Sequence, residues 1–259
     1  MQLGLKGKRA LVTGAGRGLG RAIARTLAKE GAKVCVISRT AAELQNLTDE
    51  MGGESSGHLG FAMDLMPIRA PHRLIERLKK YNFFHPDIVV HNLGGTLDIT
   101  NPLCSIEDWK KVWRFNLEVA LELNLMVVPA MRKKGWGRIV HISSISAMEN
   151  HGPVSYCSVK AALTAYARSM GRVLAPEGIV VTAVLPGAVF TAGGYWDHAS
   201  KNQPAHVKKY LSERMAIRRF GKPDEIADVV AFLCSDKASF CIGSIIPVDG
   251  GQGRGFFGQ

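Results

Sequence analysis

Short apolar runs alternate with amphipathic stretches along the whole chain. Runs of mostly aliphatic and β-branched residues predict about seven strands, at 9–13, 33–38, 59–64, 87–92, 138–144, 179–186 and 243–251. Between them, apolar residues at helical spacing predict helices at about 20–32, 41–51, 69–80, 106–131, 153–175 and 223–235. Because the strands are apolar on both sides and no hairpin turn joins them, the pattern indicates a parallel sheet with helices on both faces.

This alternation continues from one end of the chain to the other. A chain of 259 residues is long enough for one large α/β domain, and no internal repeat or low-complexity linker divides it. We therefore predict a single domain over 1–259 with a doubly wound parallel sheet, the Rossmann type of α/β fold. The stretch 188–220 lacks a strand pattern and is predicted to be loop-rich with short helices.

The composition narrows the class of protein. The chain is 46% hydrophobic with mixed charge, as in soluble globular proteins, and no apolar run reaches the ~18–20 residues of a membrane-spanning helix. No apolar signal segment precedes the first strand, and the five cysteines lack the spacing of a disulfide framework or a zinc site. We expect a cytoplasmic protein without membrane or metal partners.

The net charge of +11 raises the question of an acidic partner. Nucleic acid, a phosphorylated ligand and an acidic protein all fit a basic chain. The basic residues are spread over many segments, however, and the longest cluster is only 132–134. This dispersal favours solvated helix faces over a nucleic-acid surface.

A glycine-rich loop follows the first strand directly. The sequence TGAGRGLGRAIA lies between that strand and the first helix, at the start of a βαβ unit. Glycine permits a tight turn and close approach of the backbone to a ligand, and the helix N-terminus directs free amides at a pyrophosphate. An ordinary turn is the alternative, but this context favours dinucleotide binding. The loop residues concerned are Gly14, Gly16, Arg17, Gly18, Leu19 and Gly20.

The end of the second strand indicates which dinucleotide binds. Sites selective for NAD place Asp or Glu there, about 20 residues beyond the glycines, to hold the ribose 2′-hydroxyl. Here the strand ends in Ser38 and Arg39, and Arg17 lies in the glycine-rich loop. Two guanidinium groups without a carboxylate suit a 2′-phosphate, with ordinary surface charge as the alternative for both arginines. We predict NADP(H) as the cofactor.

These features resemble the short-chain dehydrogenase/reductase family, in its single-domain branch, over nearly the whole chain. TGAGRGLG resembles the family's TGxxxGxG loop, YCSVK its YxxxK active-site element, and ISS the strand that carries the catalytic serine. The resemblance implies an oxidoreductase whose catalytic residues are Asn116, Ser144, Tyr156 and Lys160. Ser143 is the alternative to Ser144.

The resemblance also implies cofactor contacts outside the glycine-rich loop. They are Asp64, Leu65, Asn92, Gly94, Pro186, Gly187, Val189 and Thr191, in addition to Tyr156 and Lys160. Asp64 matches the family's acid beside the adenine, and Thr191 is implied to reach the nicotinamide carboxamide. The chain departs from the family's NNAG pattern with HNLG, in which His91 and Leu93 replace Asn and Ala. We interpret His91 as a core histidine rather than a catalytic group.

The pair Tyr156 and Lys160 carries the expected chemistry. Residues four apart share one face of a helix, about 5–6 Å apart at Cβ. A neighbouring ammonium, together with the positive charge of the oxidised nicotinamide, is expected to lower the pKa of the phenol from about 10. Tyr156 then exchanges a proton with the oxygen of a carbonyl or secondary alcohol while NADP(H) exchanges the hydride. By resemblance, Lys160 also binds the nicotinamide ribose, Ser144 bonds the reacting oxygen, and Asn116 holds a water for proton transfer.

The substrate stays open between two classes. The layout resembles 3-oxoacyl-[acyl-carrier-protein] reductases, and a basic protein suits an acidic carrier. Glu177 argues against carrier docking, because a base is expected there, and the segment 149–151 (Glu-Asn-His) suits a keto sugar unless it forms only a solvated turn. A non-catalytic NADP(H) sensor is the alternative of a different class, although the catalytic pair is intact.

The two longest predicted helices indicate a homo-oligomer. The helices at 106–131 and 153–175 carry apolar residues beyond a single stripe, and such helices tend to bury the extra face against a partner. The family resemblance implies a four-helix contact between subunits. We predict a homotetramer.

The segment 190–220 is predicted to be a mobile lid over the substrate. Gly193 and Gly194 permit large backbone changes, and the aromatic residues Tyr195 and Trp196 follow them. Such a lid would exclude water from hydride transfer. The alternative is a rigid excursion that only builds the subunit surface.

Overall fold

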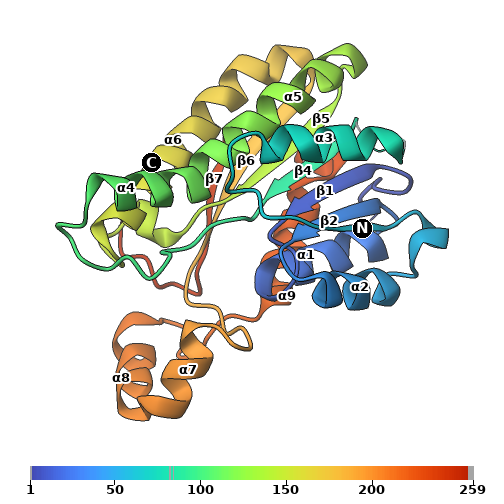
Figure 1. Cartoon of the computed structure of the whole chain (residues 1–259). Helices are drawn as coiled ribbons and strands as arrows, with labels where there is room; N and C mark the ends of the chain where they lie inside the picture. The colour runs from blue at the N-terminus through green and yellow to red at the C-terminus, as the bar shows by residue number, and fades with distance from the viewer. Residues whose placement is uncertain (1, 82, 84, 256–259) are drawn as a thin grey trace.

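Within the described residues, seven parallel strands form one sheet at the centre of the molecule (Figure 1). The structure, a computed structural model, describes residues 2–81, 83 and 85–255. The strands are β1 Arg9–Thr13, β2 Lys33–Ser38, β3 Leu59–Ala62, β4 Ile88–His91, β5 Gly137–Ile142, β6 Ile179–Pro186 and β7 Ile245–Val248. Their order is β3-β2-β1-β4-β5-β6-β7, so the winding reverses between β1 and β4. Doubly wound sheets bind ligands at the carboxyl ends of strands beside such a reversal.

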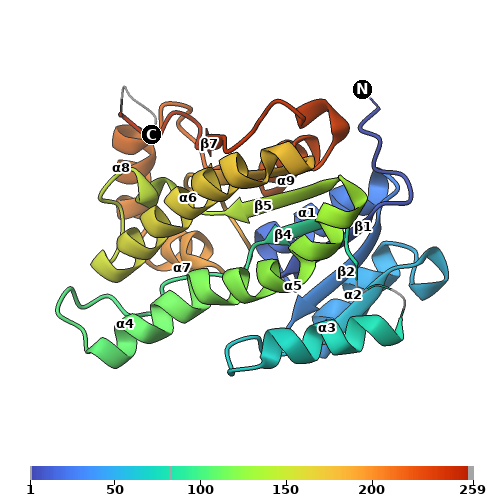
Figure 2. The same ribbon diagram turned by 90° about the horizontal axis from the view of Figure 1, so that it is seen from above.

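Helices cover both faces of the sheet (Figures 1 and 2). One layer consists of α1 Gly18–Lys29, α2 Ala41–Glu50 and α9 Pro223–Leu233. The other consists of α3 Ala70–Lys80, α5 Val119–Lys134 and α6 Val154–Leu174. This arrangement confirms the predicted doubly wound parallel sheet, because parallel strands need helical crossovers that return over one face or the other.

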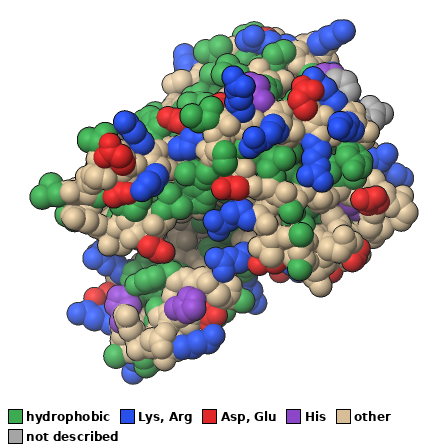
Figure 3. Space-filling view, in the orientation of Figure 1, with side chains coloured by type: hydrophobic (Ala, Val, Ile, Leu, Met, Phe, Trp, Pro, Cys, Tyr) green, Lys and Arg blue, Asp and Glu red, His purple; other side chains and the backbone are tan. Residues whose placement is uncertain are grey.

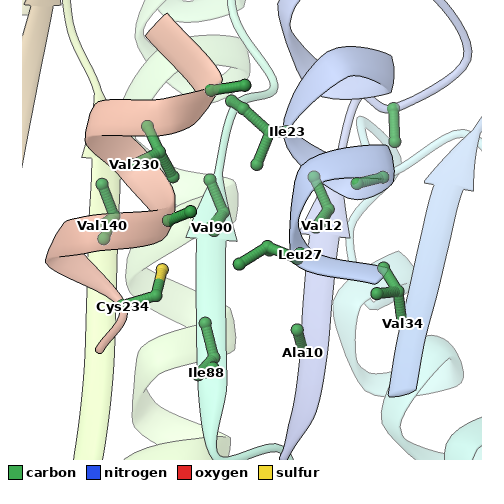
Figure 4. Packing of buried hydrophobic residues seen from close by; sticks show 14 of the residues in the cluster. Ala10, Val12, Ile23, Leu27, Val34, Ile88, Val90, Val140, Val230 and Cys234 are labelled. Atoms are coloured by element: carbon green, nitrogen blue, oxygen red, sulfur yellow. The ribbon is translucent and has the colours of Figure 1, made fainter. Parts of the chain in front are cut away.

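Both faces of the central part of the sheet are buried, because neighbouring residues of the central strands enter opposite cores. On the side of α1 and α9, Val12 and Val90 pack with Leu27 (Figure 4). Their neighbours Leu11 and Val89 face the core on the side of α3, α5 and α6. Full burial of such a side chain contributes ~1.5–3 kcal/mol. The strand ends, and with them the loops that carry the site, are therefore fixed by packing on two sides.

The long helix predicted at 106–131 is interrupted. It consists of α4 Ile106–Trp113, a π-helical turn at Arg114–Glu118, and α5. A π turn adds one residue to a helical turn and is frequent at functional sites. Asn116 lies at its centre and is buried. Apolar spacing predicts the helix but not this extra residue.

The segment after β6 forms a lobe that projects away from the sheet (Figure 1). It contains the short helices α7 Tyr195–Asn202 and α8 Pro204–Arg214, as the loop-rich pattern predicts. The ring centroid of Trp196 lies 4.3 Å from that of Tyr210 and 4.7 Å from that of Phe220. None of the described residues of α8 is buried. The lobe therefore depends on a few aromatic contacts rather than on the main cores.

Short 3₁₀ turns join several of these elements, at Glu54–Ser56, Ile145–Ala147, Ala175–Glu177 and Asp236–Ala238. The five cysteines are free thiols, and Cys35 and Cys234 are buried. In the part of the chain that the structure describes, no helix is long and apolar enough to cross a membrane.

Candidate active site

A cavity of about 680 Å³ lies at the carboxyl ends of the central strands, where the winding reverses. Its walls are the loops that follow β1, β2, β3, β4, β5 and β6. Figure 3 shows the molecule hollowed between the lobe of α7 and α8 and the body that contains the sheet. All predicted cofactor-binding and catalytic residues line the cavity except Gly20 and Asn116. The fold thus brings together residues that are as distant in sequence as Gly14 and Thr191.

The glycine-rich loop forms one wall and leads directly into α1. Gly14 and Gly18 have φ values of 66° and 58°, which glycine adopts at little cost. Gly20 lies behind this wall, because a Cβ there would collide with the carbonyl oxygen of Gly14 and lie 2.5 Å from Nδ2 of Asn92. Gly20 lets α1 pack closely against the strand ends, behind the residues that face the cavity.

Asn92 ties the loop after β4 to the loop after β1. Its Nδ2 donates to the carbonyl oxygens of Thr13 at 3.2 Å and Gly14 at 2.8 Å. The Oγ1 of Thr13 accepts from the backbone amides of Asn92 and Leu93, both at 3.2 Å. Leu93, the departure from the family pattern, lines the cavity and packs against the core beneath it. These bonds hold two walls of the cavity at a fixed separation.

Ser144, Tyr156 and Lys160 meet at the end of the cavity that β5 and α6 form. The side chain of Ser144 hydrogen-bonds the phenol of Tyr156. The Nζ of Lys160 lies 5.6 Å from the ring centroid of Tyr156 and donates to the carbonyl oxygen of Ile142 at 2.9 Å. Lys160 is only 2% exposed. The spacing of four residues does place the phenol and the amine side by side, in a site that excludes most water.

Two serines follow β5, and they face different ways. The hydroxyl of Ser143 donates to the carbonyl oxygen of Lys160 at 3.1 Å and pairs with the hydroxyl of Thr164 at 3.0 Å. The Oγ of Ser144 instead accepts from the amide of Ser146 at 3.1 Å and faces Tyr156. Of the two candidates, Ser144 is the one whose side chain faces Tyr156.

Burial dominates the protonation of the phenol and the amine. It raises the pKa of Tyr156 to about 12, and the hydrogen bond with Ser144 only partly opposes the rise. It lowers the pKa of Lys160 to about 7. In the protein alone, the loss of water around the phenol is the larger effect. Tyr156 is therefore protonated at neutral pH, and Lys160 is close to half charged. The lowering of the pKa of Tyr156 by Lys160 together with the oxidised nicotinamide stays a prediction.

Asn116 lies behind the catalytic residues. Its Oδ1 accepts from the amide of Gly95, and its Nδ2 donates to the carbonyl oxygens of Gly95 and Val112, each at 2.9 Å. Asn116 and Lys160 border the same space beside Gly94, since a Cβ on Gly94 would lie 2.7 Å from Oδ1 of Asn116 and 3.0 Å from Nζ of Lys160. Asn116 therefore holds the loop that faces the cavity and does not line the cavity itself.

The corner between the glycine-rich loop and the end of β2 contains a carboxylate that the sequence reasoning missed. Ser38 and Arg39 line the cavity here, and so does Glu43 from the first turn of α2. The guanidinium of Arg17 lines the cavity too, but it donates to the carbonyl oxygen of Gly193 in the lobe. A Cβ on Gly16 would lie 2.8 Å from Oγ of Ser38 and would collide with Oε2 of Glu43. The sequence signal at this position is misleading, because TAAE at the start of α2 matches a capping box, whereas the side chain of the N-cap residue Thr40 forms no capping hydrogen bond in the structure.

The remaining wall of the cavity is partly apolar. Leu97 and Phe115 line it from the loop after β4 and from the π turn, and Trp196 lines it from the lobe. Only Trp196 was selected from the sequence, because irregular loops and π turns carry no periodic signal. The other lining residues that sequence reasoning left out of the site are Ile37, Thr40, Met63, Met66, Ile142 and Gly194.

The segment between Ser144 and α6 has its polar groups engaged outside the cavity. The carboxylate of Glu149 accepts from the backbone amide of Arg254 and lies 2.9 Å from Nε2 of His151. The Oγ of Ser146 donates to the carbonyl oxygen of His151 at 2.5 Å. The segment therefore holds the C-terminal stretch at Arg254 against the loop that follows Ser144. Neither Glu149 nor His151 is among the described residues that line the cavity.

The chain resembles known proteins over nearly its whole length. The sequence family described as enoyl-(acyl carrier protein) reductase matches residues 14–252. The 3-oxoacyl-[acyl-carrier-protein] reductase of Aquifex aeolicus is 34% identical over 97% of this chain and 100% of its own. The structure of L-sorbose reductase from Gluconobacter frateurii, complexed with NADPH and L-sorbose, is 30% identical with a TM-score of 0.89 and covers 97% of this chain and 98% of that one. A 3-oxoacyl (acyl-carrier-protein) reductase from Agrobacterium tumefaciens with NADP bound is 29% identical with a TM-score of 0.87 over 96% of each chain.

These similarities agree with the class that the fold and the site define. The chain belongs to the short-chain dehydrogenase/reductase family and is an oxidoreductase. The family prediction made from the glycine-rich loop and the YCSVK element is confirmed.

Proposed function

We propose that the protein transfers a hydride between NADP(H) and a carbonyl carbon or secondary alcohol, with Tyr156 as the acid and base. The observation that carries this proposal is one continuous cavity that contains both the glycine-rich loop and the hydrogen-bonded pair of Ser144 and Tyr156. A phosphate cradle and a proton donor in the same cavity suit a redox dinucleotide beside a carbonyl substrate.

The cavity fits an NADP(H) dinucleotide. The first turn of α1 faces the cavity, and its N-cap residue Arg17 satisfies none of the free amides with its side chain. Such amides bind phosphate groups. Arg17 and Arg39 add two guanidinium groups to the lining of the cavity, and Arg39 directly follows Ser38. The relatives solved with NADPH and with NADP support the same choice.

The roles of the chain's own residues follow from their protonation and position. When bound, the reduced cofactor supplies the hydride. Tyr156, whose pKa of about 12 keeps it protonated at neutral pH, donates its proton to the substrate oxygen. Ser144 hydrogen-bonds the same oxygen and stabilises its developing negative charge. A neutral phenol at rest suits the reduction of a carbonyl better than the oxidation of an alcohol.

Lys160 restores the proton that Tyr156 gives up, and Asn116 positions a water for this transfer. The pKa of Lys160, about 7, lets the amine gain and lose a proton near neutral pH and so restore the proton of Tyr156. We propose that Asn116 holds a water beside Lys160. Its Oδ1 uses one lone pair for the amide of Gly95 and keeps another for that water.

A 3-oxoacyl thioester is the substrate class that we propose first. The relative from Aquifex aeolicus is a 3-oxoacyl-[acyl-carrier-protein] reductase, and the side chains of Leu97, Phe115 and Trp196 in the wall suit an acyl chain. Glu177, the acid that argues against carrier docking, forms an ion pair with Arg132 at 2.5 Å. Its charge is therefore compensated.

A keto sugar is the second candidate. The similarity to L-sorbose reductase, with a TM-score of 0.89, favours it. The polar segment that was expected to contact such a substrate is bonded elsewhere, however, because Glu149 and His151 pair with each other and Glu149 also binds the backbone of Arg254. The sugar hypothesis thus rests on the similarity alone.

We also propose that the protein is a homotetramer in the cytoplasm. Leu125 on α5 and Val173 on α6 are 77% and 60% exposed, and Trp113 on α4 is 37% exposed. Large apolar side chains on neighbouring helix surfaces are typical of subunit contacts. Five free thiols suit a reducing compartment.

Carbonyl-dependent oxidation of NADPH tests the proposed reaction. Tyr156→Phe removes the proton donor and keeps the ring, so we expect kcat/KM to fall about 10²–10⁴-fold while NADPH still binds in a fluorescence titration. The matched control, Tyr81→Phe at an exposed position, should keep the wild-type rate. A panel from acyl thioesters to keto sugars, with NADPH and with NADH, identifies the substrate class. Binding of NADPH without turnover of any carbonyl would indicate a sensor instead.

A further inference from the structure

A carboxylate lies in one corner of the cavity, beside Ser38 and Arg39. Glu43 lies in the first turn of α2, and its Oε2 is so close to Gly16 that a Cβ there would collide with it. The same Cβ on Gly16 would lie 2.8 Å from the Oγ of Ser38. Arg17 and Arg39 line the cavity from the glycine-rich loop and from the end of β2. Glu43 therefore lies between the loop and the strand end.

The charges of this corner are not paired with one another. Among the ion pairs of residues 2–81, 83 and 85–255, none contains Glu43, Arg17 or Arg39. Arg21, the arginine that does contact Glu43, donates to its backbone carbonyl oxygen rather than to its carboxylate. The carboxylate therefore keeps its lone pairs and its negative charge for whatever enters the corner.

We propose that Glu43 is a specificity-determining residue that accepts a hydrogen bond from the ribose 2′-hydroxyl of NAD(H) and repels the 2′-phosphate of NADP(H). A carboxylate in such a corner favours the hydroxyl, whereas arginines accommodate the phosphate. Here the carboxylate comes from the helix and not from the strand end, where sequence reasoning looks for it. The inference rests on the proposed dinucleotide function, and it adds that the protein binds NADH as well as NADPH.

Dissociation constants of NADPH and NADH test this role, measured by fluorescence titration of the full chain without substrate. Glu43→Gln removes the charge and retains the shape of the side chain. We expect NADPH to bind about tenfold more tightly, which corresponds to ~1.4 kcal/mol, and NADH to bind no better than before. Because salt screens charges at a partly exposed site, the gain should shrink as ionic strength rises from about 0.01 M to about 1 M.

Glu54→Gln is the matched control. Glu54 is exposed, lies just beyond α2 and loses the same charge, so the ratio of the two dissociation constants should stay at its wild-type value. An unchanged ratio in Glu43→Gln, or an equal change in Glu54→Gln, would overturn the role of Glu43. A wild-type protein that binds neither dinucleotide would overturn the proposed function itself, so the two failures are distinguishable.

Discussion

Two walls of the same cavity are built in different ways. The wall of the glycine-rich loop and the loop after β4 is held by Asn92, which bonds the carbonyl oxygens of Thr13 and Gly14, and β4 beneath it is buried along its whole length. The wall that contains Trp196 belongs to the lobe of α7 and α8. Within α7, all of which is described, Ala199 is the one buried residue. One wall is fixed by the core of the fold, and the other rests on a few contacts of its own.

The difference indicates that the two walls have different functions. Segments with few buried apolar contacts open at a small cost in free energy, whereas segments anchored in the core open only with the whole domain. The lobe is tied to the body by isolated bonds, such as that from Nε2 of Gln252 to the hydroxyl of Tyr210 at 2.5 Å and that from Arg17 to the carbonyl oxygen of Gly193 at 3.3 Å. The fixed wall suits the cofactor, and the lobe suits a substrate that must enter and leave.

The largest change in stability that we expect comes from replacing one glycine by alanine in each of the two regions, which adds one methyl group to each. In Gly20→Ala, the new Cβ collides with the backbone oxygen of Gly14, which Asn92 holds in place, so the free energy of unfolding should fall by about 3 kcal/mol. In Gly194→Ala, the new Cβ meets Oγ1 of Thr191, a hydroxyl that rotates away, and lies 3.0 Å from the backbone oxygen of Thr191, so we expect a smaller loss of about 1 kcal/mol. Urea unfolding measures both variants, and equal losses would contradict the comparison.

A smaller, pH-dependent change in stability is expected from two histidines beneath the fixed wall. His91 and His141 stack with ring centroids 4.7 Å apart. Burial lowers the pKa of His91 to about 4 and that of His141 well below 6.5, where the charge of Lys160 adds to the effect. The unfolded chain binds protons near pH 6.5 and the folded chain only at lower pH, so stability present above pH ~6.5 is lost as the pH falls toward 4. From pH ~6.5 to ~5, we expect a loss of about 2 kcal/mol per histidine.

A variant of His141 separates this effect from general acid lability. Neither ring nitrogen of His141 has a hydrogen-bond partner within the described structure, so His141→Leu removes a titrating group without breaking a hydrogen bond. The loss of unfolding free energy between pH ~6.5 and ~5 should then fall by about half. Replacement of the exposed His72 by Gln should leave the loss as it is in the wild type. If His141→Leu lost as much unfolding free energy over this pH range as the wild type does, the assignment of part of the loss to His141 would be wrong.

The contrast between the walls also explains what the sequence could predict. The fixed wall follows from local signals, because a glycine-rich loop between a strand and a helix, or a tyrosine four residues before a lysine, has one geometry in a parallel α/β sheet. Glu43 reaches the cavity through the packing of α2 on the loop, and the apolar pattern of 106–131 does not mark the extra residue of the π turn at Asn116, so neither follows from periodicity. The pKa of Tyr156 depends on burial by the whole fold, which the local spacing of Tyr156 and Lys160 does not report.

The smallest change that we expect is in the amide exchange of the lobe, which reports its motion. We predict that 190–220 is a lid that becomes ordered when cofactor and substrate fill the cavity, because Trp196 lines the cavity and its contacts increase with a ligand in place. Amide exchange in α7 and α8 should slow about tenfold with NADPH and a bound carbonyl substrate, which corresponds to ~1.4 kcal/mol. Exchange in β4, which is already buried, should stay unchanged.

Trp196→Ala distinguishes a lid from a rigid wall. A lid needs the ring of Trp196 to close on the ligand, so the variant should lose the slowing of exchange in α8 while it keeps its affinity for NADPH, which the fixed wall binds. The matched control is Trp113→Ala, on α4 and outside the cavity wall, and it should retain the slowing. Equal exchange with and without ligands in the wild-type protein would mean that the lobe is as fixed as the wall opposite, and that Trp196 belongs to the scaffold.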